Sequence, residues 1–167
     1  MKKLLIMRHA KSSWGDNALA DHDRVLNERG QRDAPRMGRF LASKGHRPQE
    51  ILSSTAIRAR TTATLTAEAA RWPCHISEFS DLYHASPRDA IARLQELSDS
   101  TNTALLVAHN PGVSELVASL TAEYLNMVTA CVAQIDLSIE RWQDLTLEPV
   151  HVLQAHWFPK GLPDDFV

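Results

Sequence analysis

The chain has 167 residues, a length that predicts a single domain over residues 1–167 with a substantial core. Hydrophobic residues make up 44% and charged residues 23%, the balance of an ordinary globular protein. The formal net charge of -2 argues against nucleic acid as the main partner. The first apolar run spans only residues 4–7, too short for a signal peptide or a membrane span, so we expect a cytoplasmic protein without membrane association.

The two cysteines, Cys74 and Cys131, lie far apart and form no CxxC motif. This spacing predicts neither a disulfide framework nor a zinc site, and we expect both to be reduced, buried thiols. The histidines other than His9 and His109 show no convincing metal-ligand spacing, and acidic residues do not cluster with them. We therefore expect no metal site.

Short apolar or alternating runs predict strands in the first two thirds of the chain, at residues 4–7, 50–53, 75–79 and 103–108. The run at 103–108 is apolar throughout, which favours a central strand with parallel neighbours. Residues 10–26 are polar and contain a Trp-Gly-Asp-Asn turn signal, so they predict a long loop.

The first predicted helix runs from a cap at Asn27 to about Lys44, with an apolar face at helical spacing. Pro35 is unusual inside a helix. It marks either a kink or, with Asp33 as the cap, the true start of the helix.

Further helices are predicted over residues 56–72, from the Ser-Pro-Arg-Asp sequence at 86–89, and after His109. Ser86 and Pro87 give the second of these a cap and a proline at its first position. In the last of them we expect Asn110 to be the cap and Pro111 the first residue.

The last third of the chain has a different pattern. Residues 130–139 and 149–158 are rich in strand-forming types and predict a hairpin-like pair or two edge strands, and residues 159–163 predict an irregular surface tail. Because strands and helices alternate before this point, the predicted fold is α/β: a three-layer α/β/α sandwich with a mostly parallel central sheet.

Three predicted strands are followed by residue types suited to phosphoryl transfer: Arg8 and His9 after the first, Arg58 after the second and His109 after the fourth. The carboxyl ends of parallel strands share one edge of a sheet, where ligands bind. A phosphoryl group in transfer needs an in-line nucleophile, with cations and N–H donors around its oxygens. A histidine can attack phosphorus, and arginines donate in a bidentate manner.

Each of these residues has an ordinary structural explanation when it is taken alone. A single histidine after a strand is usually a hydrogen-bonded surface or core residue, and an arginine on a helix is usually a solvated charge. The functional interpretation depends on all three strand ends carrying a group that suits phosphate.

Three motifs together resemble the histidine phosphatase superfamily, which contains phosphoglycerate mutases and related phosphatases. They are Leu-Ile-Met-Arg-His-Ala at 5–10, Ser-Ser-Thr-Ala-Ile-Arg-Ala-Arg-Thr-Thr at 53–62 and Ala-His-Asn-Pro-Gly at 108–112. The short phosphohistidine phosphatase branch of SixA type is similar in length, in the Arg-His-Ala-Lys-Ser opening and in residues 23–30. The resemblance covers residues 3–120 well and the last third only loosely.

The resemblance implies a phosphoglycerate mutase-like fold with no metal and no organic cofactor. It implies that His9 is the phosphorylated nucleophile, and that Arg8, Arg58 and His109 form the phosphate pocket. Arg24 matches a further arginine that binds the substrate phosphate in the short branch, although a salt bridge to Asp21 or Asp23 would also explain it.

The chain departs from the family pattern at two places. Ala10 stands where a glycine is common, so the backbone there must avoid a positive φ or accept strain. Many members also carry a glutamate general acid soon after the third strand, and this chain has none. Asp81 and His84 are the candidates for a proton donor in that region.

The missing glutamate favours one class of substrate. An alkoxide leaving group needs a proton, whereas imidazole, with a pKa of about 6.5, can leave without a strong acid. We therefore expect a phosphatase that removes phosphate from phosphohistidine on a signalling or phosphocarrier protein. The alternatives are a small-molecule or broad phosphomonoesterase and a non-catalytic module that binds phosphoproteins.

The short connection between the second and third helices also predicts an open pocket that would admit a phosphorylated side chain on a protein surface. Trp14, Tyr83 and Trp157 are candidates for its rim.

Overall fold

The strand β1 (Lys2–Arg8) lies in the middle of the sheet because its apolar side chains are buried on both faces. In the computed structural model, which describes residues 1–166, Leu4 and Ile6 pack into one hydrophobic core and Leu5 and Met7 into the other. The neighbouring strand β4 (Thr103–Ala108) divides its side chains in the same way. A continuous apolar run is the pattern expected of such a doubly covered strand.

The sheet has six strands in the order β3-β2-β4-β1-β5-β6. The strands β2 (Glu50–Ser54) and β3 (His75–Phe79) are parallel to β4, as β4 is to β1. The strands β5 (Val132–Leu137) and β6 (Val152–Trp157) form the predicted antiparallel pair, and β6 lies at the edge. The sheet is therefore mostly parallel, as predicted.

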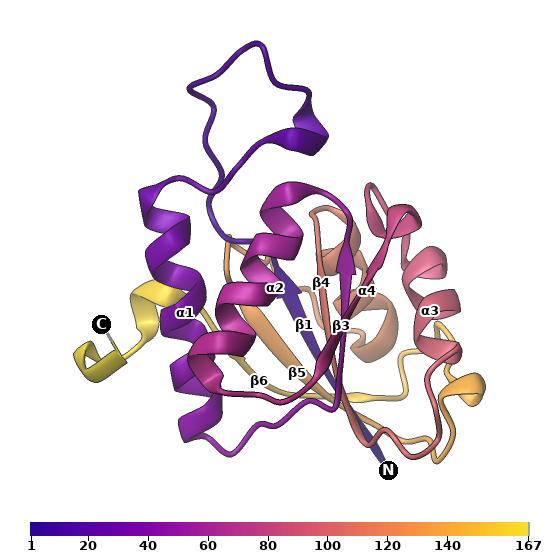
Figure 1. Cartoon of the computed structure of the whole chain (residues 1–167). Coiled ribbons are helices and arrows are strands. Elements are labelled where there is room, and N and C mark those ends of the chain that lie inside the picture. The colour runs from indigo at the N-terminus through magenta and orange to yellow at the C-terminus, as the bar shows by residue number, and fades with distance from the viewer. Residues whose placement is uncertain (167) are drawn as a thin grey trace.

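The helices cover both faces of this sheet (Figure 1). α1 (Glu28–Ser43) and α2 (Ile57–Ala70) contribute to one core, and α3 (Pro87–Gln95) and α4 (Gly112–Thr121) to the other. This confirms the three-layer α/β/α prediction. In Figure 1 the segment after β1 extends beyond the carboxyl edge of the sheet.

The start of α1 distinguishes the two interpretations of Pro35. The side chain of Asn27 accepts a hydrogen bond of 2.9 Å from the Gly30 N–H, so the helix begins upstream and Pro35 lies inside it. The alternative start at Asp33 is wrong. The predicted cap at Ser86 is confirmed, with a capping box to Asp89.

The predicted cap of α4 is wrong. Helix α4 begins at Gly112 with Pro111 in the cap position. The Asn110 side chain instead donates to the carbonyl of Met127 at 2.8 Å and accepts from the Ser114 hydroxyl at 2.7 Å. It therefore ties the loop after β4 to the segment that precedes β5.

The C-terminal segment is more ordered than predicted. It forms two 3-10 turns, Pro159–Gly161 and Asp164–Phe166, and Leu162 is buried. Arg36 of α1 donates to the carbonyls of Pro159, Leu162 and Pro163 at 3.0 to 3.1 Å, so this segment packs on α1. A local sequence pattern cannot predict this packing, because the three carbonyls lie far from Arg36 in the chain.

Both cysteines are free, as predicted, but only Cys131 is buried, because Cys74 lies half-exposed next to the end of α2. Among residues 1–166, no helix is long and apolar enough to cross a membrane.

Gly30 is where α1 packs on the backbone of the loop after β1. A Cβ atom at this position would lie 2.1 Å from the Lys11 carbonyl oxygen. We expect Gly30→Ala to lower the free energy of unfolding by about 1–3 kcal/mol, because this backbone contact must open. Urea unfolding measures the change. Gly15→Ala is the control, since the nearest atom there is 3.4 Å away. Equal stability of the two variants would contradict the packing.

Candidate active site

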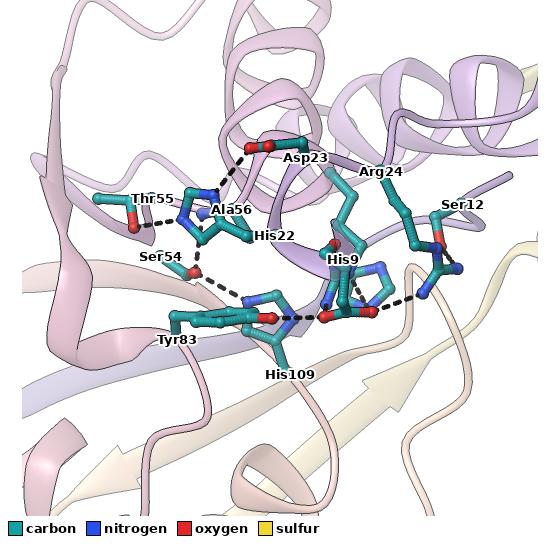
Figure 2. A network of polar contacts seen from close by, with 12 residues as sticks. His9, Ser12, His22, Asp23, Arg24, Ser54, Thr55, Ala56, Tyr83 and His109 are labelled. Carbon is teal, nitrogen blue, oxygen red and sulfur yellow. Dashed lines mark hydrogen bonds and ion pairs between the residues drawn. The ribbon is translucent and has the colours of Figure 1, made fainter. Parts of the chain in front are cut away.

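Three of the predicted site residues meet at the carboxyl edge of the sheet. His9 follows β1, His109 follows β4, and Arg58 lies in the first turn of α2 after β2. The two imidazole rings are 5.1 Å apart between centroids, and the Arg58 Nε lies 3.4 Å from the His9 Nε2. All three side chains are buried. Figure 2 shows His9 between His109 and Tyr83 on one side and Arg24 on the other.

The tautomer of His9 is fixed by its neighbour in the chain. Its Nδ1 lies 2.7 Å from the carbonyl oxygen of Ala10, which can only accept, so Nδ1 carries the proton. The lone pair is then on Nε2, which faces Arg58. Ala10 is held in turn by Thr62, whose hydroxyl accepts from the Ala10 N–H at 2.9 Å. Ala10 avoids a positive φ, so the replacement of glycine brings no backbone strain.

Both histidines are held neutral by their surroundings. Burial, followed by Arg58, Arg8 and Arg24, lowers the pKa of His9 to about 4. Burial, followed by His9 and Arg58, lowers the pKa of His109 to about 3. A neutral imidazole has a free lone pair, which a nucleophile requires.

His109 has one ring nitrogen in use and one free. Its Nε2 lies 2.8 Å from the Ser54 hydroxyl, which also accepts from the Ala56 N–H at 3.1 Å. Its Nδ1 is buried and has no hydrogen-bond partner among residues 1–166. If the Ser54 hydroxyl donates to Nε2, then Nδ1 carries the proton and can donate to an oxyanion.

Arg8 is a half-buried cation without an acidic partner in the described residues. Its Nη1 donates to the Met127 carbonyl at 3.1 Å, and its Nε is buried and unpaired. Burial and the nearby Arg58 lower its pKa. Positive charge that is buried without a counterion indicates a site for an anion.

Arg24 also reaches the site, and the predicted salt bridge to Asp21 is present. Its Nη1 forms a salt bridge of 2.9 Å with Asp21, and its Nε and Nη2 donate to the Ser13 carbonyl and the Ser12 hydroxyl. It is buried and close enough to His9 to lower the pKa of that histidine. Asp23, the other predicted partner, instead lies 3.2 Å from His22.

Asp21, which the sequence offered only as a salt-bridge partner of Arg24, has more contacts at this site than predicted. Its carboxylate accepts from Arg24 Nη1, from Arg58 Nη2 at 3.0 Å and from the Tyr83 hydroxyl at 2.6 Å. These hydrogen bonds, that of Tyr83 first, hold the pKa of Asp21 well below its usual range. The carboxylate therefore occupies donors of two arginines that suit a phosphoryl group. Its position three residues before Arg24 was the available signal.

Comparison with known proteins identifies the family of this chain. Residues 4–81 match the sequence model of the histidine phosphatase superfamily (branch 1). An uncharacterised protein of Mycobacterium leprae is 34% identical over 163 residues, which cover 90% of this chain and 98% of the relative. The chain belongs to the histidine phosphatase superfamily. Membership of this family supports phosphatase activity.

Solved structures of SixA have the same fold. SixA from Agrobacterium tumefaciens is 24% identical, with a TM-score of 0.80 over 95% of this chain and 98% of that one. The protein histidine phosphatase SixA complexed with tungstate is 22% identical, with a TM-score of 0.82 over 96% of this chain and 99% of that one.

The two residues offered as proton donors are placed differently. Asp81 turns outward, where Arg93 binds its carboxylate at 2.6 to 3.1 Å. His84 is exposed and lies against Tyr83, with 3.9 Å between the ring centroids. Tyr83 itself points inward, 5.5 Å from the His109 ring. Of the two proposed donors, His84 therefore lies nearer to the pocket, next to Tyr83.

The three aromatic residues predicted for the rim differ as well. Tyr83 lies at the pocket. Trp14 is exposed and stacks on Arg24, whose guanidinium carbon Cζ lies 3.2 Å from the centroid of the Trp14 ring. Trp157 does not belong to the rim, because it packs against Phe40 and His46 on the α1 side of the sheet.

Within residues 1–166, no group of three or more metal-binding side chains is found.

The low pKa of His9 is directly measurable. We expect its imidazole to titrate near pH 4 in the anion-free protein, and Arg58→Gln to raise this midpoint because a nearby positive charge is removed. Nitrogen-detected NMR titration of the ring gives the value. Arg47→Gln, on an exposed residue at the opposite edge of the sheet, should not move it. A midpoint near the ordinary value of about 6.5 would contradict the electrostatics.

The pairing of Asp21 with two arginines predicts competition with anions. We expect Asp21→Asn to bind inorganic phosphate about tenfold more tightly, because a like charge next to the anion is removed. Calorimetric titration at fixed ionic strength measures the change. Asp23→Asn is the matched control, since the Asp23 carboxylate pairs with His22 rather than with either arginine. Unchanged or weaker binding by Asp21→Asn would show that its carboxylate does not compete.

Proposed function

We propose that this chain is a phosphatase that transfers a phosphoryl group to His9 Nε2 and then to water. The observation that carries the proposal is the neutral His9, with its lone pair on Nε2, beside the cations Arg8 and Arg58. The other ring nitrogen, Nδ1, keeps its proton throughout and donates it in a hydrogen bond to the Ala10 carbonyl. The phosphorylated ring is then cationic, which makes it a good leaving group in the second step.

The pocket residues take separate roles in this proposal. Arg8, Arg58 and His109 donate to the equatorial oxygens, and Arg24 adds positive charge from the loop. His109 donates from Nδ1, oriented by Ser54. Water attacks the phosphorus of phosphorylated His9, the P–N bond breaks, and dihydrogen phosphate leaves with both protons of the water.

We further propose phosphohistidine on a signalling or phosphocarrier protein as the substrate. In support, Asp21 is a poor proton donor because its pKa is strongly lowered, and Asp81 points away from the pocket toward Arg93 on the surface. An imidazole that is protonated at its other nitrogen leaves without such a donor. SixA structures share the fold, and one of them is the protein histidine phosphatase SixA complexed with tungstate, a phosphate-like oxyanion.

The alternative within enzymes is a small-molecule phosphomonoesterase, and mycobacterial glucosyl-3-phosphoglycerate phosphatase has a related fold at a TM-score of 0.69. An alkoxide leaving group needs a proton, and His84 and Tyr83 are the groups placed to give one. A non-catalytic phosphoprotein-binding module would not need the lone pair that is preserved on His9. The cytoplasmic location stays a prediction.

The nucleophile is tested by trapping. We expect wild type to form an acid-labile phosphohistidine at residue 9 when it is quenched during turnover of radiolabelled phosphoramidate. His9→Ala should form none and lose about 10⁴-fold or more in kcat/KM. His75→Ala, an exposed histidine at the opposite edge, is the matched control. A phosphoenzyme that persists in His9→Ala would refute the assignment.

For the substrate class, we expect a higher kcat/KM for phosphohistidine proteins than for sugar phosphates and p-nitrophenyl phosphate.

A further inference from the structure

A second cavity, of about 400 Å³, lies between the first turns of α1 and the C-terminal segment. We call it the basic cavity. Its wall includes Arg29, Arg32, Arg36, Val128, Phe158 and Lys160. The roles proposed for His9 and its neighbours make no use of it.

The charge of this cavity is unlike that of the whole chain. Four cationic side chains and one carboxylate, Asp33, line it, so it carries three net positive charges on a protein of net charge -2. Asp33 lies 3.8 Å from Arg29 and 3.9 Å from Arg32, which are 47% and 62% exposed in their side chains. Much of the positive charge is therefore available to a ligand.

The cavity also exposes apolar surface. Phe158 is 41% exposed and Val128 is 47% exposed, although large apolar side chains are usually covered. Aromatic and arginine side chains together are the types enriched at protein interfaces. The matching ligand is an acidic surface that carries at least one apolar side chain.

One chain segment joins the cavity to the active site. The Met127 carbonyl accepts from Arg8, and the Ala130 N–H donates to the carbonyls of Arg8 and His9. Between them, Val128 and Thr129 line the basic cavity, and Thr129 accepts from Arg29 at 3.1 Å. The segment 127–130 is therefore a wall shared by the two sites.

We propose that the basic cavity docks the protein that carries the phosphohistidine, through an acidic and apolar segment beside the phosphorylated residue; this inference rests on the proposed function. A small phosphate ester held at His9 has no groups that reach beyond this wall, whereas a folded protein presents surface on both sides of it. The exposed cations also steer an acidic partner and raise its association rate at low salt.

Binding is tested without catalysis. The probe is the peptide acetyl-Glu-Asp-Phe-Glu-Asp-amide, titrated into the isotope-labelled full chain and followed by NMR. We expect salt-sensitive shifts at residues 128–129 and 158–160, and at least about fivefold weaker binding to the double variant Arg32→Glu with Lys160→Glu. Arg47→Glu, the same change at the opposite edge, should bind like wild type. No binding, or equal binding by the double variant, would overturn the proposal.

Turnover tests the role of docking. The substrates are phosphoramidate and a histidine-phosphotransfer domain phosphorylated with it. In the double variant we expect kcat/KM for the protein to fall at least about tenfold more than kcat/KM for phosphoramidate. Equal losses on both substrates would overturn the proposal. If wild type hydrolyses neither substrate, the proposed function fails, while the peptide titration still decides what the basic cavity binds.

Discussion

Buried positive charge around one neutral imidazole is the constraint on which the site depends. Arg8, Arg24 and Arg58 approach His9, and Asp21 is the carboxylate that pairs with two of them. Desolvated guanidinium groups are costly unless a negative charge compensates theirs. In the anion-free protein Asp21 compensates part of this positive charge, and a dianionic phosphoryl group would compensate the remainder. Burial and the same arginines keep His9 unprotonated, so in the proposed mechanism they would favour both anion binding and nucleophilicity.

The sheet explains why these groups meet. Since β1, β2 and β4 are adjacent and parallel, the residues that follow them share one edge, although they are far apart in the chain. This part of the site could be predicted from the sequence, because an apolar run followed at once by Arg-His or His-Asn identifies both a strand and its end. The helix caps at Asn27 and Ser86 were predictable for a similar reason, since capping is a local interaction.

The remaining features depend on contacts between distant segments. Asp21 lies in a long polar loop; its pair with nearby Arg24 was predictable, but its contacts with Arg58 and Tyr83 join it to two other segments. Asp81 and Tyr83 are two residues apart, and only the structure shows that the first turns outward and the second inward. Asn110 has the sequence of a cap, but its amide is used by Met127. Local patterns contain no information on such partners.

The lack of the family's glutamate and the low pKa of Asp21 both limit proton donation to a leaving group. A carboxyl group that two arginines and a tyrosine hold ionised cannot give up a proton, so it orders the arginines rather than protonating a leaving group. This property of Asp21 fits the proposed phosphohistidine substrate, whose leaving group needs no proton from the enzyme.

The most direct measurement is a crystal structure of the protein with orthovanadate. We expect vanadium within bonding distance of His9 Nε2, equatorial oxygens held by Arg8, Arg58 and His109, and the Asp21 carboxylate moved away from Arg58. Vanadate bound elsewhere, or bound while Asp21 keeps both arginines and His9 stays uncoordinated, would contradict the roles proposed for these residues.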